Sequence, residues 1–268
     1  MHKPFFSKYK LVFFYLIAFA VSWIFWLMMA GVLHSRSLLS PFTLLFSTLG
    51  AAGPLLALLL LDKLTGARHA RNIFKSLRIR GVNRGLFALC VAALPLLRIM
   101  GNAIHALQPD KGFQIIKEGP ADLGMLVIPV MLVHFAAALF TSPLLEEPGW
   151  RGFALPRLQA RYGRLAGSLV VGMLWWLWHQ PMNLAFGIEP SLYGFISMLS
   201  VSFCIDSLYN LSGRNILFAM LVHQSGGTVI MFFYQPDQNL LTLLPLFLFA
   251  AGLRIRESKR SCRIAADL

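Results

Sequence analysis

The stretch from residue 144 to residue 152 reads Leu-Leu-Glu-Glu-Pro-Gly-Trp-Arg-Gly and follows an almost uninterrupted apolar run. It places three ionisable side chains, those of Glu146, Glu147 and Arg151, at the end of a segment suited to a membrane interior. Insertion of one such group into hydrocarbon costs about 2.5–3.5 kcal/mol. On a helix, Glu147 and Arg151 are four residues apart and can form an ion pair. Glu146 then points about 100° away around the helix axis, where it can serve a different task.

The composition is that of a polytopic membrane protein. Of the 268 residues, 57% are hydrophobic and only 13% are charged, and the mean hydropathy is +0.66. A helix needs about 20 residues to cross the hydrocarbon core of a bilayer. Apolar stretches near this length recur at residues 11–33, 38–61, 85–107, 123–145, 165–187, 191–211, 214–234 and 240–253. We therefore predict an all-α bundle of about eight transmembrane helices.

The net charge of +13 is explained by membrane topology. Lysine and arginine gather in alternate connections: at the N-terminus, at 62–84, at 151–164, at Arg214 and in the tail from 254 to 268. The positive-inside rule then places both termini in the cytoplasm. Such loops attract lipid headgroups, so we expect membrane lipids as partners and no nucleic acid. The prediction is a multi-pass protein of the cell membrane.

The chain reads as one membrane-embedded helical domain, 1–268. No internal repeat is evident, which argues against a transporter built from repeated halves. The later apolar spans are joined by tight connections near 187–191, 212–213 and 235–239. Connections this short make neighbouring helices antiparallel. The basic loop at 62–84 is amphipathic and is predicted to lie on the cytoplasmic surface.

The end of the fourth apolar span is ambiguous. Hydropathy alone ends the span at Leu145 and leaves Glu146 at the membrane edge. The helical pattern of apolar residues nevertheless continues to Tyr162. If the helix continues that far, Glu146 lies about 25 Å of helix away from the following turn. Pro148 and Pro156 oppose this extension, because an interior proline kinks or breaks a helix.

A helical hairpin would bring Glu146 opposite a histidine. Counting equally in both directions from a turn just before Gly163 pairs Glu146 with His179 of the fifth span. A second hairpin turns near Gly213 and places His223 about 14 Å along its own helix. The sequence therefore predicts that one glutamate and two histidines, from three helices, lie at similar depth on the cytoplasmic side.

These three side chains can support hydrolysis in two ways. Zinc commonly takes three protein ligands and keeps a fourth position for water, and a bound metal lowers the pKa of that water towards 7. Glu146, His179 and His223 are the predicted ligands of such a divalent metal. In the metal-free alternative, Glu146 acts as the general base, while the histidines orient the water or stabilise the oxyanion. The sequence leaves both mechanisms open.

Other ionisable residues in the apolar spans are interpreted as structural. His105 and His134 fit hydrogen-bonded bundle residues, and Arg98 and Asp206 fit ion pairs or hydrogen bonds at helix ends. The tryptophans beside His179 are interpreted as packing or interface residues.

Three motifs follow one another on successive apolar spans. They are Glu146-Glu147-x-x-x-Arg151-Gly152, Trp175-x-x-x-His179-x-Pro181, and His223 preceded by Leu-Tyr-Asn-Leu-Ser-Gly-Arg at 208–214. In this order they resemble the CAAX protease and bacteriocin-processing family of intramembrane endopeptidases, over residues 125–235. Two positions depart from the family pattern. Trp175 stands where phenylalanine is usual, and Gly227 stands where asparagine or another polar residue is usual. Gln224, Ser225 or Thr228 are candidates to replace that polar side chain.

The resemblance implies an eight-helix protein whose membrane-embedded site opens towards the cytoplasm and cleaves peptides near a C-terminus or within a leader. It implies that Glu146 activates the water, that Glu147 and Arg151 support the site structurally, and that His179 and His223 bind metal or position the water. The predicted function is an intramembrane endopeptidase acting on a peptide or protein substrate. The alternative is a non-catalytic immunity or partner-binding protein on the same scaffold.

Overall fold

The computed structural model describes residues 3–33, 40–79, 81–236 and 238–266. The described residues are helical, apart from connections and one isolated antiparallel bridge between Ile116 and Phe233. The all-α prediction is therefore confirmed. The chain forms two compact units, one from 1–77 with 140–191 and the other from 78–139 with 192–268. Each unit draws on two separate stretches of sequence, so the division is not one of successive domains.

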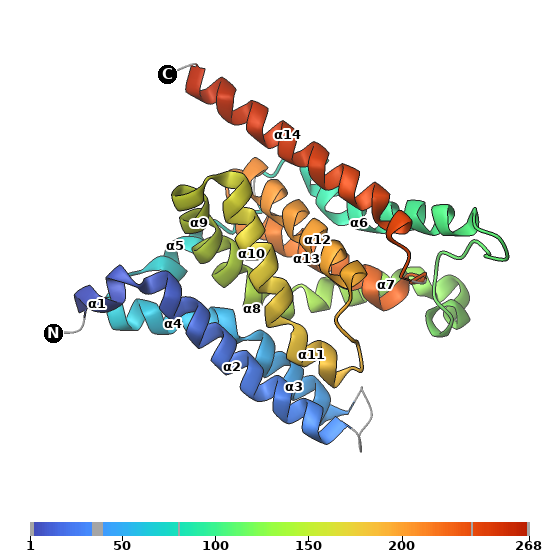
Figure 1. Ribbon diagram of the computed structural model, residues 1–268, viewed down its shortest axis with the longest axis horizontal. Helices are drawn as coiled ribbons and strands as arrows, with labels where there is room; N and C mark the ends of the chain where they lie inside the picture. Colours follow the sequence, from blue (N-terminus) through green and yellow to red (C-terminus); the bar gives the residue numbers. More distant parts are fainter. Residues whose placement is uncertain (1–2, 34–39, 80, 237, 267–268) are drawn as a thin grey trace. The chain divides into compact units, whose positions relative to one another are not determined.

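The first unit is built around a long N-terminal helix (Figure 1). Helix α2 packs along α3 and α4 and against α11, while α9 pairs with α10. The elements are α1 (Lys3–Lys8), α2 (Lys10–Leu33), α3 (Pro41–Ala51), α4 (Gly53–Thr65), α5 (His69–Lys75), α8 (Ser142–Glu147), η2 (Pro148–Ala154), α9 (Leu155–Tyr162), α10 (Arg164–Trp178) and α11 (Gln180–Ala185).

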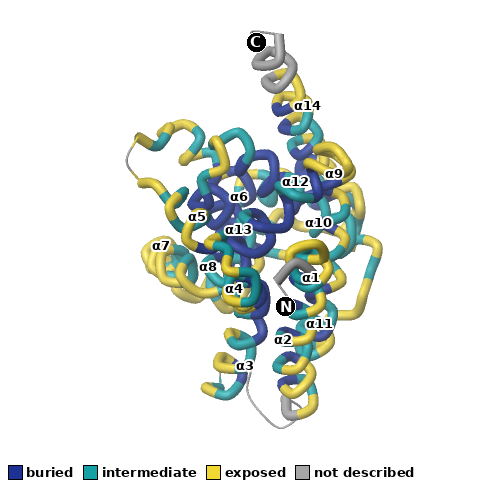
Figure 2. Tube along the Cα trace, turned by 90° about the vertical axis from the view of Figure 1, so that its left-hand side faces the viewer, coloured by how far each residue is buried: buried dark blue, intermediate teal, exposed yellow. Residues whose placement is uncertain are grey.

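The second unit is centred on α13, which contacts α6, α7 and α12. Figure 2 shows α13 buried over much of its length and α7 largely exposed. The elements are α6 (Arg84–Ala106), η1 (Gly119–Leu126), α7 (Val127–Ala138), α12 (Leu192–Leu211), α13 (Ile216–Phe232), η3 (Leu240–Leu243) and α14 (Leu244–Ala266).

The described residues contain fewer clear membrane spans than the eight predicted. Four helical stretches are long and apolar enough: Lys10–Gly31, Arg84–Ala106, Gly119–Tyr162 and Leu192–Leu211. A fifth is reached if α3 and α4, bent by 44° against each other, count as one span. The predicted fifth span is interrupted at His179, and α13 has only 17 residues. The protein is thus a multi-helix membrane protein, and the count of eight is not confirmed.

The predicted extension of the fourth span is confirmed. Elements α8, η2 and α9 follow one another without a gap from Ser142 to Tyr162. The proline at 148 is accommodated because η2 is a π-helix, in which the backbone N–H of Leu155 bonds to the carbonyl of Trp150, five residues back. Single π-helical turns are rare and occur frequently at functional sites. Glu146 therefore lies within a long helical arm.

The predicted turn before α10 is also confirmed. Gly163 has φ 81° and ψ 166°, a region that is essentially reserved for glycine. Four residues further on, Gly167 lies against the backbone of Leu158 and Gln159, where an added Cβ would be 2.6 Å from the Gln159 nitrogen. Counting equally from the turn pairs Leu158 with Gly167, so the two arms begin in the predicted register.

The loop at 62–84 carries a short surface helix, α5, that is fixed to the first unit by polar contacts. The Asp62 carboxylate accepts the backbone N–H groups of His69 and Ala70 at 3.0 and 2.8 Å. The Arg157 Nη2 lies 3.3 Å from His69 Nδ1. Since arginine can only donate, this contact requires a neutral imidazole. Burial and the charge of Arg157 correspondingly lower the pKa of His69.

Arg98 and Asp206 have structural partners, as predicted, whereas the Nδ1 atoms of His105 and His134 are buried without a hydrogen-bond partner among the described residues. The Arg254 guanidinium lies 3.5 Å from the Asp206 carboxylate and 3.0 Å from that of Glu257. The Arg98 guanidinium donates to the Tyr193 hydroxyl at 3.2 Å. These contacts lie within the second unit and connect α12 with α14 and with α6.

A prediction concerns the contact between α9 and α10. Gly167→Val should lower the free energy of unfolding by about 1–3 kcal/mol, because the added side chain meets backbone atoms that cannot move aside. Ala166→Val is the matched control, since Ala166 is exposed on the same helix. The measurement is denaturant unfolding in detergent micelles. Equal stability of the two variants would contradict the close approach of the two helices.

Candidate active site

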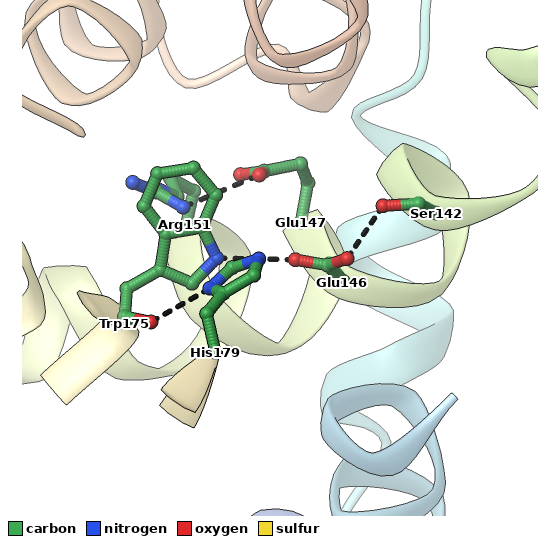
Figure 3. A network of polar contacts seen from close by, with 6 residues as sticks. All are labelled: Ser142, Glu146, Glu147, Arg151, Trp175 and His179. Atoms are coloured by element: carbon green, nitrogen blue, oxygen red, sulfur yellow. Dashed lines mark hydrogen bonds and ion pairs between the residues drawn. The ribbon is translucent and has the colours of Figure 1, made fainter. Parts of the chain in front are cut away.

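The Glu146 carboxylate is buried and accepts one hydrogen bond at each oxygen. Its residue is only 2% exposed. The Ser142 hydroxyl, one turn earlier on α8, donates to Oε1 at 2.5 Å. The Trp175 indole Nε1 of α10 donates to Oε2 at 3.1 Å. Figure 3 shows the carboxylate between these two donors. The side chain is thereby fixed in position and direction.

The neighbouring carboxylate has a different partner. Glu147 and Arg151 are both 0% exposed, and the Arg151 Nη1 lies 3.2 Å from Glu147 Oε1. The Arg151 guanidinium also lies 4.7 Å from the centroid of the Trp175 ring, a distance typical of a cation–π contact. The predicted division between the two glutamates is therefore visible in the contacts: Glu147 pairs with Arg151, and Glu146 faces Trp175.

His179 stands at the break between α10 and α11, which Pro181 enforces because it lacks a backbone N–H. The imidazole Nδ1 lies 2.8 Å from the carbonyl oxygen of Trp175. A carbonyl can only accept, so Nδ1 carries the proton and the lone pair of the neutral ring lies on Nε2. Histidines that act as bases or metal ligands are commonly fixed in this way.

Aromatic rings surround His179. The Trp175 and Trp178 rings meet it edge-on at 5.0 and 4.8 Å, and the Trp26 ring of α2 stacks on it at 6.0 Å. The Trp23 indole donates to the Trp178 carbonyl at 3.1 Å and ties α2 to this cluster. The rings pack around His179 and leave it only 7% exposed, and Trp175 adds to its packing the hydrogen bond to Glu146.

The hairpin brings Glu146 against α10. Counting along the two arms pairs Glu146 with His179, and the Trp175 indole, four residues nearer the turn, donates to Glu146 Oε2 at 3.1 Å. The register near the turn is as predicted, with Gly167 against Leu158 and Gln159. The π-helical η2 lies between that contact and Glu146. The direct pairing of Glu146 with His179 stays a prediction.

The third predicted residue, His223, belongs to the second unit. It lies half-buried on α13. Nearby, Gly227 is adjacent to the side chain of Gln224, whose Oε1 would lie 3.5 Å from an added Cβ. Gln224 also lies 3.4 Å from the Thr228 hydroxyl, while Ser225 donates to the Val91 carbonyl at 2.9 Å. Of the candidates to replace a polar side chain at 227, Gln224 therefore borders this position and also contacts Thr228.

Metal ligation would require residues from both units. Among the described residues, no group of three or more His, Cys, Asp or Glu side chains is gathered as a metal site needs. Within the first unit, Glu146 and His179 supply one carboxylate and one imidazole with a fixed tautomer. A third ligand from His223 stays a prediction.

Ser142 was not predicted from the sequence, and Trp175 was taken only as a motif position and a packing residue. The signal for Ser142 was present, since it precedes Glu146 by four residues and such pairs share a helix face. The signal for Trp175 was weaker. Its hydrogen bond to Glu146 depends on side-chain orientation across the hairpin, which hydropathy and counting do not reveal.

This part of the chain is similar to known proteins. Residues 128–226 match the family described as type II CAAX prenyl endopeptidase Rce1-like. The chain is also 28% identical, over 195 residues, to CAAX prenyl protease 2 of Methanococcus maripaludis. The alignment with the archaeal protein covers 64% of each chain, so the chain spans less than two thirds of that relative's length. Both comparisons support the resemblance to the CAAX protease and bacteriocin-processing family. All five predicted site residues fall inside the range matched by the family, and the range ends one residue before Gly227.

A second prediction concerns the buried ion pair. Arg151→Leu should lower the free energy of unfolding by about 3–5 kcal/mol, because it leaves the Glu147 charge buried without its partner. Arg161→Leu, which removes an exposed cation from α9, should change stability by less than about 0.5 kcal/mol. Adding Glu147→Gln to Arg151→Leu should recover part of the loss. An additive further loss in the double variant would contradict the pairing.

Proposed function

We propose that this protein is an intramembrane endopeptidase of the cell membrane that hydrolyses a peptide bond in a peptide or protein substrate. The observation that carries the proposal is the buried Glu146 carboxylate. Both of its oxygens accept hydrogen bonds from protein donors, and the indole that donates to it touches the ring of an oriented His179. A buried carboxylate held this way is expensive in a membrane protein and points to a functional role.

In the proposed reaction, Glu146 is the general base. It takes a proton from a water molecule as the water oxygen attacks the carbonyl carbon of the peptide bond. The tetrahedral intermediate carries a negatively charged oxygen, which the histidines are proposed to stabilise by hydrogen bonding. The proton then passes from Glu146 to the leaving nitrogen as the carbon–nitrogen bond breaks. The products are a carboxylic acid and an amine, and Glu146 returns to its initial state.

A divalent metal such as zinc is the second form of the proposal. Glu146, His179 and His223 would hold it, and when bound it would supply Lewis-acid activation of the water and the substrate carbonyl. The fixed tautomer of His179, with its Nδ1–H bonded to a carbonyl, suits a ligand through Nε2. The hydrogen bonds at both Glu146 oxygens suit a general base equally well, because a carboxylate has about four acceptor positions.

Glu147 and Arg151 are proposed to support this site without taking part in proton transfer. Glu147 directly follows Glu146, and its partner Arg151 lies one helical turn further on, in the π-helical η2. It fixes the helix face on which Glu146 lies. The cation–π contact of Arg151 also holds the Trp175 ring in place.

The archaeal relative suggests the first substrate to test. It is named a CAAX prenyl protease, so a prenylated C-terminal peptide is the first probe and its unprenylated counterpart the second. Membrane lipids are the expected surroundings of the substrate, and nucleic acid is not an expected partner.

A non-catalytic immunity or partner-binding role is the second candidate. The observation in its favour is Gly227, which offers no side chain at a position that is usually polar in the family. Glu146 and His179 would then have a structural role. Cleavage assays distinguish the two candidates directly.

A third prediction tests catalysis. Glu146→Ala and His179→Ala should each lower the rate of peptide cleavage by about 10²- to 10⁴-fold, the usual contribution of a general acid–base residue. Glu189→Ala, which removes an exposed carboxylate beyond α11, should leave the rate unchanged. The assay uses purified protein in detergent, with the two probe peptides and a broad peptide library, with and without a chelator. Full activity of Glu146→Ala, or no cleavage by the wild type, would refute the proposal.

A further inference from the structure

One residue, Trp175, contacts three of the site residues in the first unit: Glu146, Arg151 and His179. Its indole N–H donates to Glu146 Oε2 at 3.1 Å, and its backbone carbonyl accepts from His179 Nδ1 at 2.8 Å. Its ring faces the Arg151 guanidinium at 4.7 Å and meets the His179 ring at 5.0 Å. Figure 3 shows it between the two arms of the hairpin.

The chemistry of the indole makes this contact directional. The indole nitrogen can donate but cannot accept, so Glu146 Oε2 must be the acceptor. Ser142 donates to the other oxygen. Because the two donors come from different helices, α8 and α10, they define both the rotation of the carboxylate and its distance from α10.

Packing alone does not explain this arrangement. Trp150 and Trp178 are equally large, are both 0% exposed and lie in the same aromatic cluster. Their indole nitrogens have no hydrogen-bond partner among the described residues. Trp175 differs from them in directing its N–H at a buried carboxylate.

We propose that Trp175 is a positioning residue for the hydrolysis proposed above: its indole N–H aligns the Glu146 carboxylate while its backbone carbonyl sets the tautomer of His179. The inference rests on that proposed function. It assigns Trp175 no proton transfer and no contact with the reacting atoms. One side chain thereby couples the orientation of the two groups that are proposed to act on the water.

The kinetic test uses Trp175→Phe, which removes the N–H but keeps an aromatic ring and the backbone carbonyl. The expected result is a fall in kcat of about 10- to 100-fold with KM changed by less than about twofold, because misalignment affects the reaction step and not substrate binding. Trp150→Phe is the control, since it removes a buried indole that bonds to no carboxylate. The control should keep its kcat. An unchanged kcat in Trp175→Phe, or an equal loss in both variants, would overturn the proposal.

A second test does not depend on cleavage. The six tryptophans are labelled with ¹⁵N at the indole, and the Trp175 resonance is identified by its absence from Trp175→Phe. Glu146→Ala should shift that resonance and speed its hydrogen exchange, whereas Glu189→Ala should do neither. If Glu146→Ala changes neither the position nor the hydrogen exchange of the Trp175 resonance, the inference is overturned even if the enzyme is active. If the wild type cleaves nothing, the proposed function is refuted, and the catalytic part of the inference is refuted with it. The Trp175 resonance still reports in that case whether the hydrogen bond to Glu146 exists.

Discussion

The burial of ionisable groups among apolar helices is the constraint on which the structure of the first unit depends. Glu146, Glu147 and Arg151 lie within a stretch of six residues and are almost fully buried. Charged groups of this kind persist in an apolar interior only when they are paired or hydrogen-bonded. These groups are stabilised by an ion pair, a cation–π contact and two hydrogen bonds to the Glu146 carboxylate. Each of these contacts limits how α8, η2 and α10 can pack.

The hairpin from α8 to α10 brings these buried groups together with Trp175 in one site. A glycine turn at 163 and a close backbone approach at Gly167 set the register of the two arms. The π-helical η2 lies between this contact and Glu146. The Glu146 carboxylate accepts the Trp175 indole N–H, and the backbone carbonyl of the same tryptophan contacts His179 Nδ1. Aromatic rings from α2 and α10 surround His179 and limit the access of bulk water.

Much of this arrangement could be predicted from the sequence, because it follows from helix periodicity. The spacing of Glu147 and Arg151 predicts their ion pair, and the glycine at 163 predicts the turn. The hydrogen bond of Trp175 could not be predicted, since counting along ideal helices pairs backbone positions and does not show which side chain reaches the carboxylate. The count of eight spans is not confirmed among the described residues. Hydropathy does not detect a break such as the one that Pro181 imposes after His179. The role of His223 requires a third helix and stays a prediction.

The division of labour between the two glutamates is the central claim, and two isosteric variants test it most directly. Cleavage rate and unfolding midpoint are measured together for Glu146→Gln and Glu147→Gln. The account predicts that Glu146→Gln loses cleavage but unfolds close to the wild-type midpoint. Glu147→Gln should unfold much earlier, because it leaves the Arg151 charge buried without its partner. The reverse pattern, with Glu147 essential for the reaction and Glu146 for stability alone, would contradict the account.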